Sequence, residues 1–175
     1  MKGFLSASAL ATAAVLAFAV FSPAQEPAAA SHVRLGVYDS RAIAVAYAPS
    51  RFNPVRERMA EHERAKAAGD TKRVRELEAW GERHQRALHR QGFARVPVDD
   101  LLAHVEEHLP ELARAAGVRA IVPYCTYQGP DVELVDVTNE LVRLFEPSEK
   151  TLATVAQLLR QDPLDLDQVE RSHDH

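Results

Sequence analysis

Residues 33–40 read VRLGVYDS, a strand pattern followed at once by the beginning of a helix. Apolar side chains recur at every second position through the first five residues, which is the period of a half-buried strand. An aspartate and a serine follow, and both residue types cap the free N–H groups at helix N-termini. The stretch therefore predicts a strand over 33–38 and a short helix over 41–47, which Pro49 ends.

Two later segments predict further strands. The first extends over 118–127 and passes through Pro123, which suits a strand edge or a bulge because proline donates no backbone hydrogen bond. The second, 132–135, is a short apolar run bounded by turn residues. Together with the first strand, near 33–38, these segments predict a small β-core.

Helices are predicted for most of the remaining chain. Residues 98–116 form an amphipathic pattern, and Pro110 is expected to kink this helix or to divide it into two shorter ones. Two further helices, over 138–145 and 148–161, begin with residues that act as N-caps. The predicted fold class is therefore α+β and predominantly helical.

Between the first and second strands, residues 53–92 predict an antiparallel helical hairpin. Asn53 and Pro54 form a helix-start signal, and Gly69 and Asp70 end one helix and cap the next. A narrow seam of three- and four-residue spacings follows the second helix, at Val74, Leu77, Gly81, His84 and Leu88. So thin a stripe cannot form a globular core alone, so the hairpin is expected to project into solvent or to need a partner.

The N-terminus predicts a cleavable secretory signal peptide over 1–24. A lysine follows the first methionine, an uncharged apolar run extends over 4–21, and small residues come before Gln25. A second candidate cleavage position lies near Ala30, and an uncleaved membrane anchor is the alternative. The prediction is an exported, soluble periplasmic protein that is not an integral membrane protein after cleavage.

The rest of the chain divides into three predicted regions. Residues 25–32 are rich in proline and alanine and predict a linker. Residues 33–162 predict a single folded domain, with the hairpin as its arm. The acidic residues 163–175 predict a disordered tail.

Charge is distributed unevenly along a chain whose net charge is −4. Residues 51–95 carry 12 lysines and arginines against 7 acidic residues, whereas residues 96–175 carry 6 against 16. This predicts a basic hairpin on an acidic body, with two solvated helical faces as the alternative. Nucleic acid is not an expected partner, because the protein is exported and the helices lack the interleaved aromatics that stack bases.

Two residue patterns bear on catalysis. Cys125 is the single cysteine, so no disulfide can form within the chain, and it is predicted as a half-buried core side chain. His104, Glu107 and His108 match the H-x-x-E-H pattern of inverted zinc proteases, which needs both histidines on one helix face. No third ligand accompanies them. A zinc hydrolase is therefore the remote alternative, and no metal or cofactor is expected.

Segments on either side of the hairpin resemble the Skp/OmpH family of periplasmic chaperones. Residues 33–41, VRLGVYDSR, are similar to the family's first strand, which leads through an aspartate into a helix. Residues 98–122 resemble the returning helix, its glycine and the second strand. Residues 127–141, YQGPDVELVDVTNEL, resemble the closing segment, with Asp-x-Thr entering the final helix. The resemblance covers most of residues 33–145.

The resemblance implies a homotrimer in which short strands from each subunit form a β-core and the hairpins project as arms around a cavity. It implies a non-enzymatic holdase that binds unfolded or outer-membrane-destined proteins at many weak points. The client-contacting residues that it suggests all lie on the hairpin. They are the apolar Val55, Met59 and Trp80 and the basic Arg56, Arg64, Lys66, Lys72, Arg73, Arg83 and Arg90.

Two features depart from the family pattern. Arm helices of about 15–20 residues span only about 22–30 Å at 1.5 Å per residue, which is shorter than the family's arms. The chain is also acidic, whereas the family's chaperones are basic. These departures leave a second hypothesis open, in which the same fold serves as a structural or interaction module of the cell envelope and holds no clients.

Overall fold

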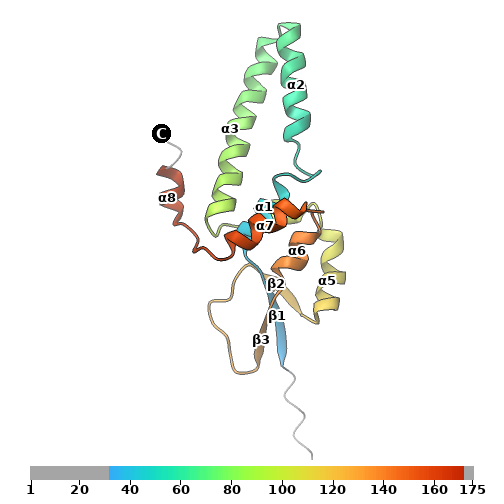
Figure 1. The fold of residues 1–175 in the computed structure, drawn as a ribbon, viewed down its shortest axis with the longest axis vertical. Coiled ribbons are helices and arrows are strands. Elements are labelled where there is room, and N and C mark those ends of the chain that lie inside the picture. Colours follow the sequence, from blue (N-terminus) through green and yellow to red (C-terminus); the bar gives the residue numbers. More distant parts are fainter. Residues whose placement is uncertain (1–31, 172–175) are drawn as a thin grey trace, which may run out of the picture. The chain divides into compact units, whose positions relative to one another are not determined.

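A small sheet of parallel strands forms the centre of the fold in the computed structural model, which describes residues 32–171 (Figure 1). Its strands are β1 (Val33–Val37), β2 (Ala120–Val122) and β3 (Val132–Asp136), in the order β2-β1-β3. β1 pairs with both neighbours, so that Gly36 lies opposite Ile121 on one side and Val135 on the other. The predicted signal peptide and nearly all of the predicted linker lie outside the described residues.

The predicted α+β class is confirmed, because helices make up 59% of the structure around this sheet. One strand prediction was too long: the second strand ends at Val122 instead of continuing to 127. Proline at 123 has no backbone N–H to extend the ladder, which accounts for the early end. β1 likewise ends one residue before the predicted boundary.

Only one face of the sheet packs against helices. Gly36 belongs to this covered face, and a Cβ atom placed on it would lie 3.1 Å from the side chain of Val137. Ile121 and Val135, in register with Gly36, pack against the hydrophobic core. The core is centred on α1 (Ser40–Tyr47), whose side chains are nearly all buried, together with residues of the later helices. Glycine at 36 thus allows the strand to pack closely against Val137 and Val118.

The predicted hairpin is present as α2 (Val55–Ala68) and α3 (Thr71–Phe93), which lie side by side and extend beyond the other helices (Figure 1). At its tip Gly69 adopts the left-handed conformation (φ 68°), and the Asp70 side chain accepts a hydrogen bond from the Arg73 N–H. At its base the Asn53 side chain donates to the Ala48 carbonyl and accepts from the Val55 N–H. The signals at Gly69 and Asp70 thus act as predicted, whereas α2 begins one residue later than predicted, with Pro54 at the N-cap position in place of Asn53.

The helix predicted over 98–116 is divided. The structure has α4 (Asp99–Leu102), a 3₁₀ turn η1 (Glu106–His108) and α5 (Leu109–Ala116). Pro110 lies in the first turn of α5, where a missing N–H costs nothing, so it begins a helix instead of kinking one. Of the two outcomes expected for Pro110, division is the one observed.

The C-terminal region holds a correction. α6 (Thr138–Arg143) and α7 (Glu149–Leu158) match the predicted helices, each ending two to three residues early. The tail predicted to be disordered over 163–175 contains α8 (Leu166–Arg171), and residues 172–175 lie outside the described residues. Val169 is fully buried and α8 packs against α3, which explains why this short segment is ordered.

Two left-handed glycines allow a direct test of packing. A Cβ on Gly69 would meet no atom within 4 Å, whereas a Cβ on Gly117 would lie 2.6 Å from the guanidinium of Arg34. Arg34 cannot move freely, because it donates to the Ala116 carbonyl and pairs with Glu133. We expect Gly69→Ala to lower the unfolding free energy by about 1 kcal/mol through backbone strain alone. Gly117→Ala should cost about 2–3 kcal/mol, because the Arg34 hydrogen bond is lost as well. Equal losses in urea denaturation would contradict this account.

Candidate functional site

The arm formed by α2 and α3 has almost no core of its own. Among its described residues the fully buried ones are Ala65, Leu77 and Gln91. So little burial cannot account for the stability of two long helices, which instead depends on their junction with α1 and on polar contacts between them. The arm is therefore a surface element, with most of its side chains available for contact with a partner.

A network of ion pairs joins the two arm helices near the tip. The Arg73 guanidinium lies 2.6 Å from a carboxylate oxygen of Glu61 and 2.8 Å from one of Glu76, and Arg58 also pairs with Glu61. The hydrogen bond from Arg73 lowers the pKa of the Glu61 carboxyl, with a further contribution from the charges of Arg73 and Arg58. Arg73 is therefore engaged within the arm and is a poor candidate for gripping a client.

An apolar groove opens along the arm, and we call it the arm groove. Its upper part has a volume of about 250 Å³ and is lined by Val55, Met59, Leu77 and Trp80. Its lower part, at the arm base, has a volume of about 600 Å³ and lies against α1 and α7. Val55 and Gly81 line both parts, so the two parts adjoin each other along the arm.

Aromatic and cationic groups organise the middle of the arm groove. The Trp80 ring stacks on the His84 ring at a centroid distance of 4.7 Å, and the Arg58 guanidinium lies 5.6 Å from the Trp80 ring centre. His84 also contacts the Asn53 side-chain oxygen at 2.9 Å. Burial lowers the pKa of His84, partly offset by Asp100, so this ring is neutral near pH 7.

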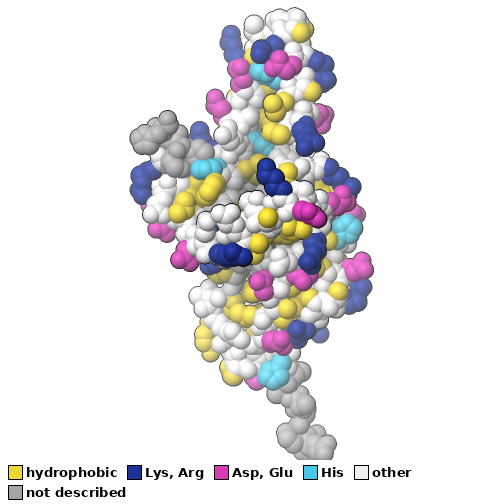
Figure 2. Space-filling view, viewed as in Figure 1, with side chains coloured by type: hydrophobic (Ala, Val, Ile, Leu, Met, Phe, Trp, Pro, Cys, Tyr) yellow, Lys and Arg dark blue, Asp and Glu magenta, His cyan; other side chains and the backbone are white. Residues whose placement is uncertain are grey.

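The apolar residues predicted as client contacts therefore come together in the arm groove. Met59 is 66% exposed, and Figure 2 shows hydrophobic side chains on the visible face of the arm among charged ones. The predicted basic residues fall into two groups. Lys66, Arg73 and Arg90 make ion pairs with Glu63, with Glu61 and Glu76, and with Glu170. Within residues 32–171, Arg56, Arg64, Lys72 and Arg83 are exposed and make none.

Several groove residues were not predicted as contacts: Arg58, His62, Leu77, Gly81 and His84. Leu77, Gly81 and His84 lie on the seam that the sequence pattern identified, but that seam was assigned to packing between the arm helices. A helix pair with so few large apolar residues cannot close its whole seam. This scarcity was the feature of the sequence from which an open groove along the seam could have been predicted.

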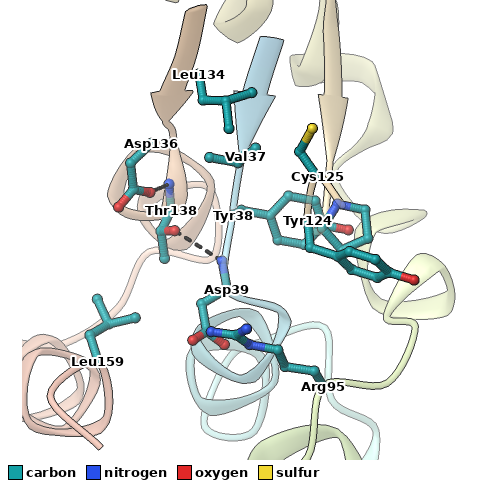
Figure 3. Close-up of a pocket in the computed structure, with 11 residues that line it drawn as sticks. Val37, Tyr38, Asp39, Arg95, Tyr124, Cys125, Leu134, Asp136, Thr138 and Leu159 are labelled. Atoms are coloured by element: carbon teal, nitrogen blue, oxygen red, sulfur yellow. Dashed lines mark hydrogen bonds between the residues drawn. The ribbon is translucent and has the colours of Figure 1, made fainter. Parts of the chain in front are cut away.

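A second cavity, of about 360 Å³, lies where the three strands end (Figure 3). Asp39 follows β1, Cys125 follows β2, and Asp136 and Thr138 follow or end β3, as is usual at the carboxyl edge of a parallel sheet. Their polar atoms are already engaged. Thr138 Oγ1 accepts from the Asp39 N–H at 3.0 Å, and an Asp136 oxygen accepts from the Thr138 N–H at 2.8 Å. These hydrogen bonds join the ends of β1 and β3 to the beginnings of α1 and α6.

Asp39 also holds a buried cation. Its carboxylate contacts the Arg41 guanidinium at 2.7 and 3.0 Å, and the Arg41 side chain is only 3% exposed. Burial by itself would raise the pKa of the Asp39 carboxyl, but hydrogen bonds and charge from Arg41, together with the charge of Arg95, lower it overall. This pair joins the end of β1 to α1 and is structural.

Cys125 is half-buried, as predicted, but it lies on the cavity wall and outside the core cluster. Its thiol donates to the Tyr127 carbonyl at 2.8 Å. Among the hydrogen bonds of the described residues, none joins the Cys125 sulfur to a side chain that could act as a base.

The face of the sheet opposite the helices is apolar and has no helix over it. In the strand register its side chains alternate with those of the covered face, and α5 and α6 lie on the other side (Figure 1). We call this surface the open sheet face. Its members are Val33, Leu35, Val37, Ala120, Val122, Val132 and Leu134, and the acidic Asp136 lies at its edge opposite Val37. All are partly or fully exposed, and Tyr124 and Tyr127 beside it are 63% and 81% exposed.

The H-x-x-E-H pattern does not have the geometry that a zinc site needs. His104 lies in a turn and His108 in η1, so the two imidazoles do not share a helix face. The His104 ring instead stacks on Tyr47 at 5.5 Å. Within residues 32–171, no three His, Cys, Asp or Glu side chains are grouped closely enough to hold a metal ion.

Comparisons with protein-family models, with curated proteins and with solved structures find no match for this chain. Between residues 32 and 171, no helix is both long and apolar enough to cross a membrane. The function must therefore be argued from the arm and from the open sheet face.

Proposed function

We propose that the protein is a periplasmic, non-enzymatic holdase of the Skp/OmpH type, which binds unfolded or outer-membrane-destined proteins along the arm groove. The observation that carries this proposal is the arm itself: a helix pair with little core, an open apolar groove and exposed arginines beside it. Unfolded chains expose apolar side chains but have no fixed shape. A long, shallow groove therefore suits them better than a closed pocket.

Self-association supports the same proposal. An apolar sheet face without a covering layer is unfavourable in water, and a sheet normally buries such a face against another layer. We infer that other copies of this chain cover the open sheet face, as the resemblance to a trimeric family implies. Several arms would then hang from one shared core, and weak contacts on separate arms would add up by avidity.

The length of the arm sets the size of the client segment. α3 has 23 residues and is about 34 Å long at 1.5 Å per residue, longer than the arm expected from the sequence. α2 has 14 residues, so the paired part of the arm is about 21 Å long. We propose that such an arm holds a local apolar segment of a client, and that several arms together hold one chain.

A holdase assay tests the proposal. Purified protein, at several-fold excess, is expected to suppress aggregation of an unfolded outer-membrane protein diluted from urea. Combining Met59→Asp with Trp80→Ala should weaken client binding about 5- to 30-fold, because a pair of central apolar contacts contributes about 1–2 kcal/mol. Fluorescence titration of labelled client measures the change.

Leu152→Asp is the matched control. Leu152 is 37% exposed on α7 and does not line the arm groove, so this variant should bind clients as the unaltered protein does. Aggregation that continues unchanged at every excess would refute the holdase proposal. Tight binding to one folded envelope protein in its place would favour an interaction module with the same fold.

A further inference from the structure

α8 is held to the arm by few contacts. The Val169 side chain is fully buried, the Glu170 carboxylate lies 3.7 Å from the Arg90 guanidinium, and the Leu164 N–H donates to the Phe93 carbonyl at 2.9 Å. A six-residue helix does not form stably by itself in water, so α8 exists because α3 binds it. Ordering this chain end costs conformational entropy, which the contacts with α3 must offset.

The charges of α8 and of its binding surface are complementary. Residues 163–171 carry three acidic side chains, Asp165, Asp167 and Glu170, against one arginine. Residues 51–95, which include α3, have five more basic than acidic side chains. α8 is therefore an acidic amphipathic segment, with one buried valine, docked on a basic helix.

The binding surface continues beyond α8. Phe93 is 46% exposed and also lines the lower part of the arm groove, whose volume is about 600 Å³. Gly81 and Gly92 of α3 line the same space, and a Cβ on either would meet no atom within 4 Å. Glycine within a helix is unfavourable, and here no intramolecular packing requires it. The two glycines keep the groove open next to the segment that α8 covers.

We propose that α8 is a displaceable occupant, held in cis, of a docking site on α3 that takes acidic amphipathic polypeptide segments. A client segment of this chemistry competes with α8 for Arg90 and for the apolar seat of Val169, and it extends into the arm groove. The proposal of a docking site depends only on the contacts that α8 makes with α3. The competition with clients rests on the proposed holdase function.

Binding of a peptide to the full-length protein tests the docking site. The probe is a fluorescent peptide of residues 161–171, QDPLDLDQVER, followed by anisotropy. Val169→Asp in the protein should free the site and tighten peptide binding at least 10-fold relative to the unaltered protein. Glu170→Arg, which alters only an exposed charge, should tighten it about 3-fold, so the test does not depend on the folding of one variant.

A charge exchange identifies the seat. Adding Arg90→Glu to the Val169→Asp protein should weaken peptide binding about 3-fold, the size expected for a half-exposed ion pair, and a peptide carrying Glu170→Arg should recover most of this loss. Arg114→Glu, an equal charge change on α5, away from the arm groove, is the control and should change the affinity less than 2-fold. Equal peptide affinity in the unaltered, Val169→Asp and Arg90→Glu proteins would overturn the docking site.

Client binding separates the two proposals. An unfolded outer-membrane protein should bind the Val169→Asp protein at least 3-fold more tightly than the unaltered protein, and excess peptide should displace it. Peptide binding without any client binding would leave the docking site standing and refute the holdase function. Weaker client binding by the Val169→Asp protein would overturn the competition.

Discussion

Asp39→Asn is expected to lower the unfolding free energy by about 3–5 kcal/mol, the largest loss that we predict for a single substitution. Asparagine can still cap α1, but it removes the negative charge beside Arg41. The Arg41 side chain is 3% exposed and would keep its charge without a partner of opposite sign in contact. Urea denaturation followed by circular dichroism measures the loss.

A double variant separates charge burial from the loss of a cap. Asp39→Asn combined with Arg41→Met should recover most of the lost stability, because a buried ion pair replaced by uncharged groups costs little. A double variant as unstable as the single one would show that the pair contributes through something other than its charge.

The Asp39–Arg41 pair also predicts how the stability of the protein changes at low pH. Because folding lowers the pKa of the Asp39 carboxyl, its stabilising contribution is fully present above its ordinary value of 3.8. That contribution is lost as the pH falls from there through the lowered pKa. The difference in stability between the unaltered protein and Asp39→Asn should therefore narrow below pH 4. A difference that widens in acid would contradict this assignment.

Leu35→Asp is expected to abolish self-association without unfolding the subunit. Leu35 lies at the centre of the open sheet face, between Ala120 and Leu134 in the strand register. In the proposed oligomer an aspartate there would be buried without a partner, which costs about 3–5 kcal/mol. At about 1.4 kcal/mol per factor of ten, the dissociation constant should rise at least 100-fold.

Light scattering coupled to size-exclusion chromatography measures this effect as a fall in absolute mass to that of the monomer. Leu152→Asp makes the same chemical change on α7, away from the sheet, and should leave the mass of the assembly unchanged. A monomeric unaltered protein at tens of micromolar would remove the shared core on which the several-armed holdase depends.

Local signals explain which parts of the fold were predictable. The hairpin ends follow from Asn53, Gly69 and Asp70, whose side chains or left-handed backbone act on atoms within a few residues. The same holds for Ser148, which caps α7. Val55, Met59 and Trp80 were identifiable as candidate contacts because they are large apolar side chains on otherwise polar helices.

The amino-acid sequence by itself therefore determined the approximate positions of the three strands, of the arm and of most other helices, since propensity, capping and periodicity need only neighbouring residues. The tertiary structure alone decided the β2-β1-β3 order, which face of the sheet stays open and the docking of α8 on α3. The burial of Arg41 beside Asp39, whose backbone N–H donates to Thr138 Oγ1, was decided at the same level. These features depend on burial and charge pairing between segments as many as 99 residues apart, and no local pattern encodes such contacts.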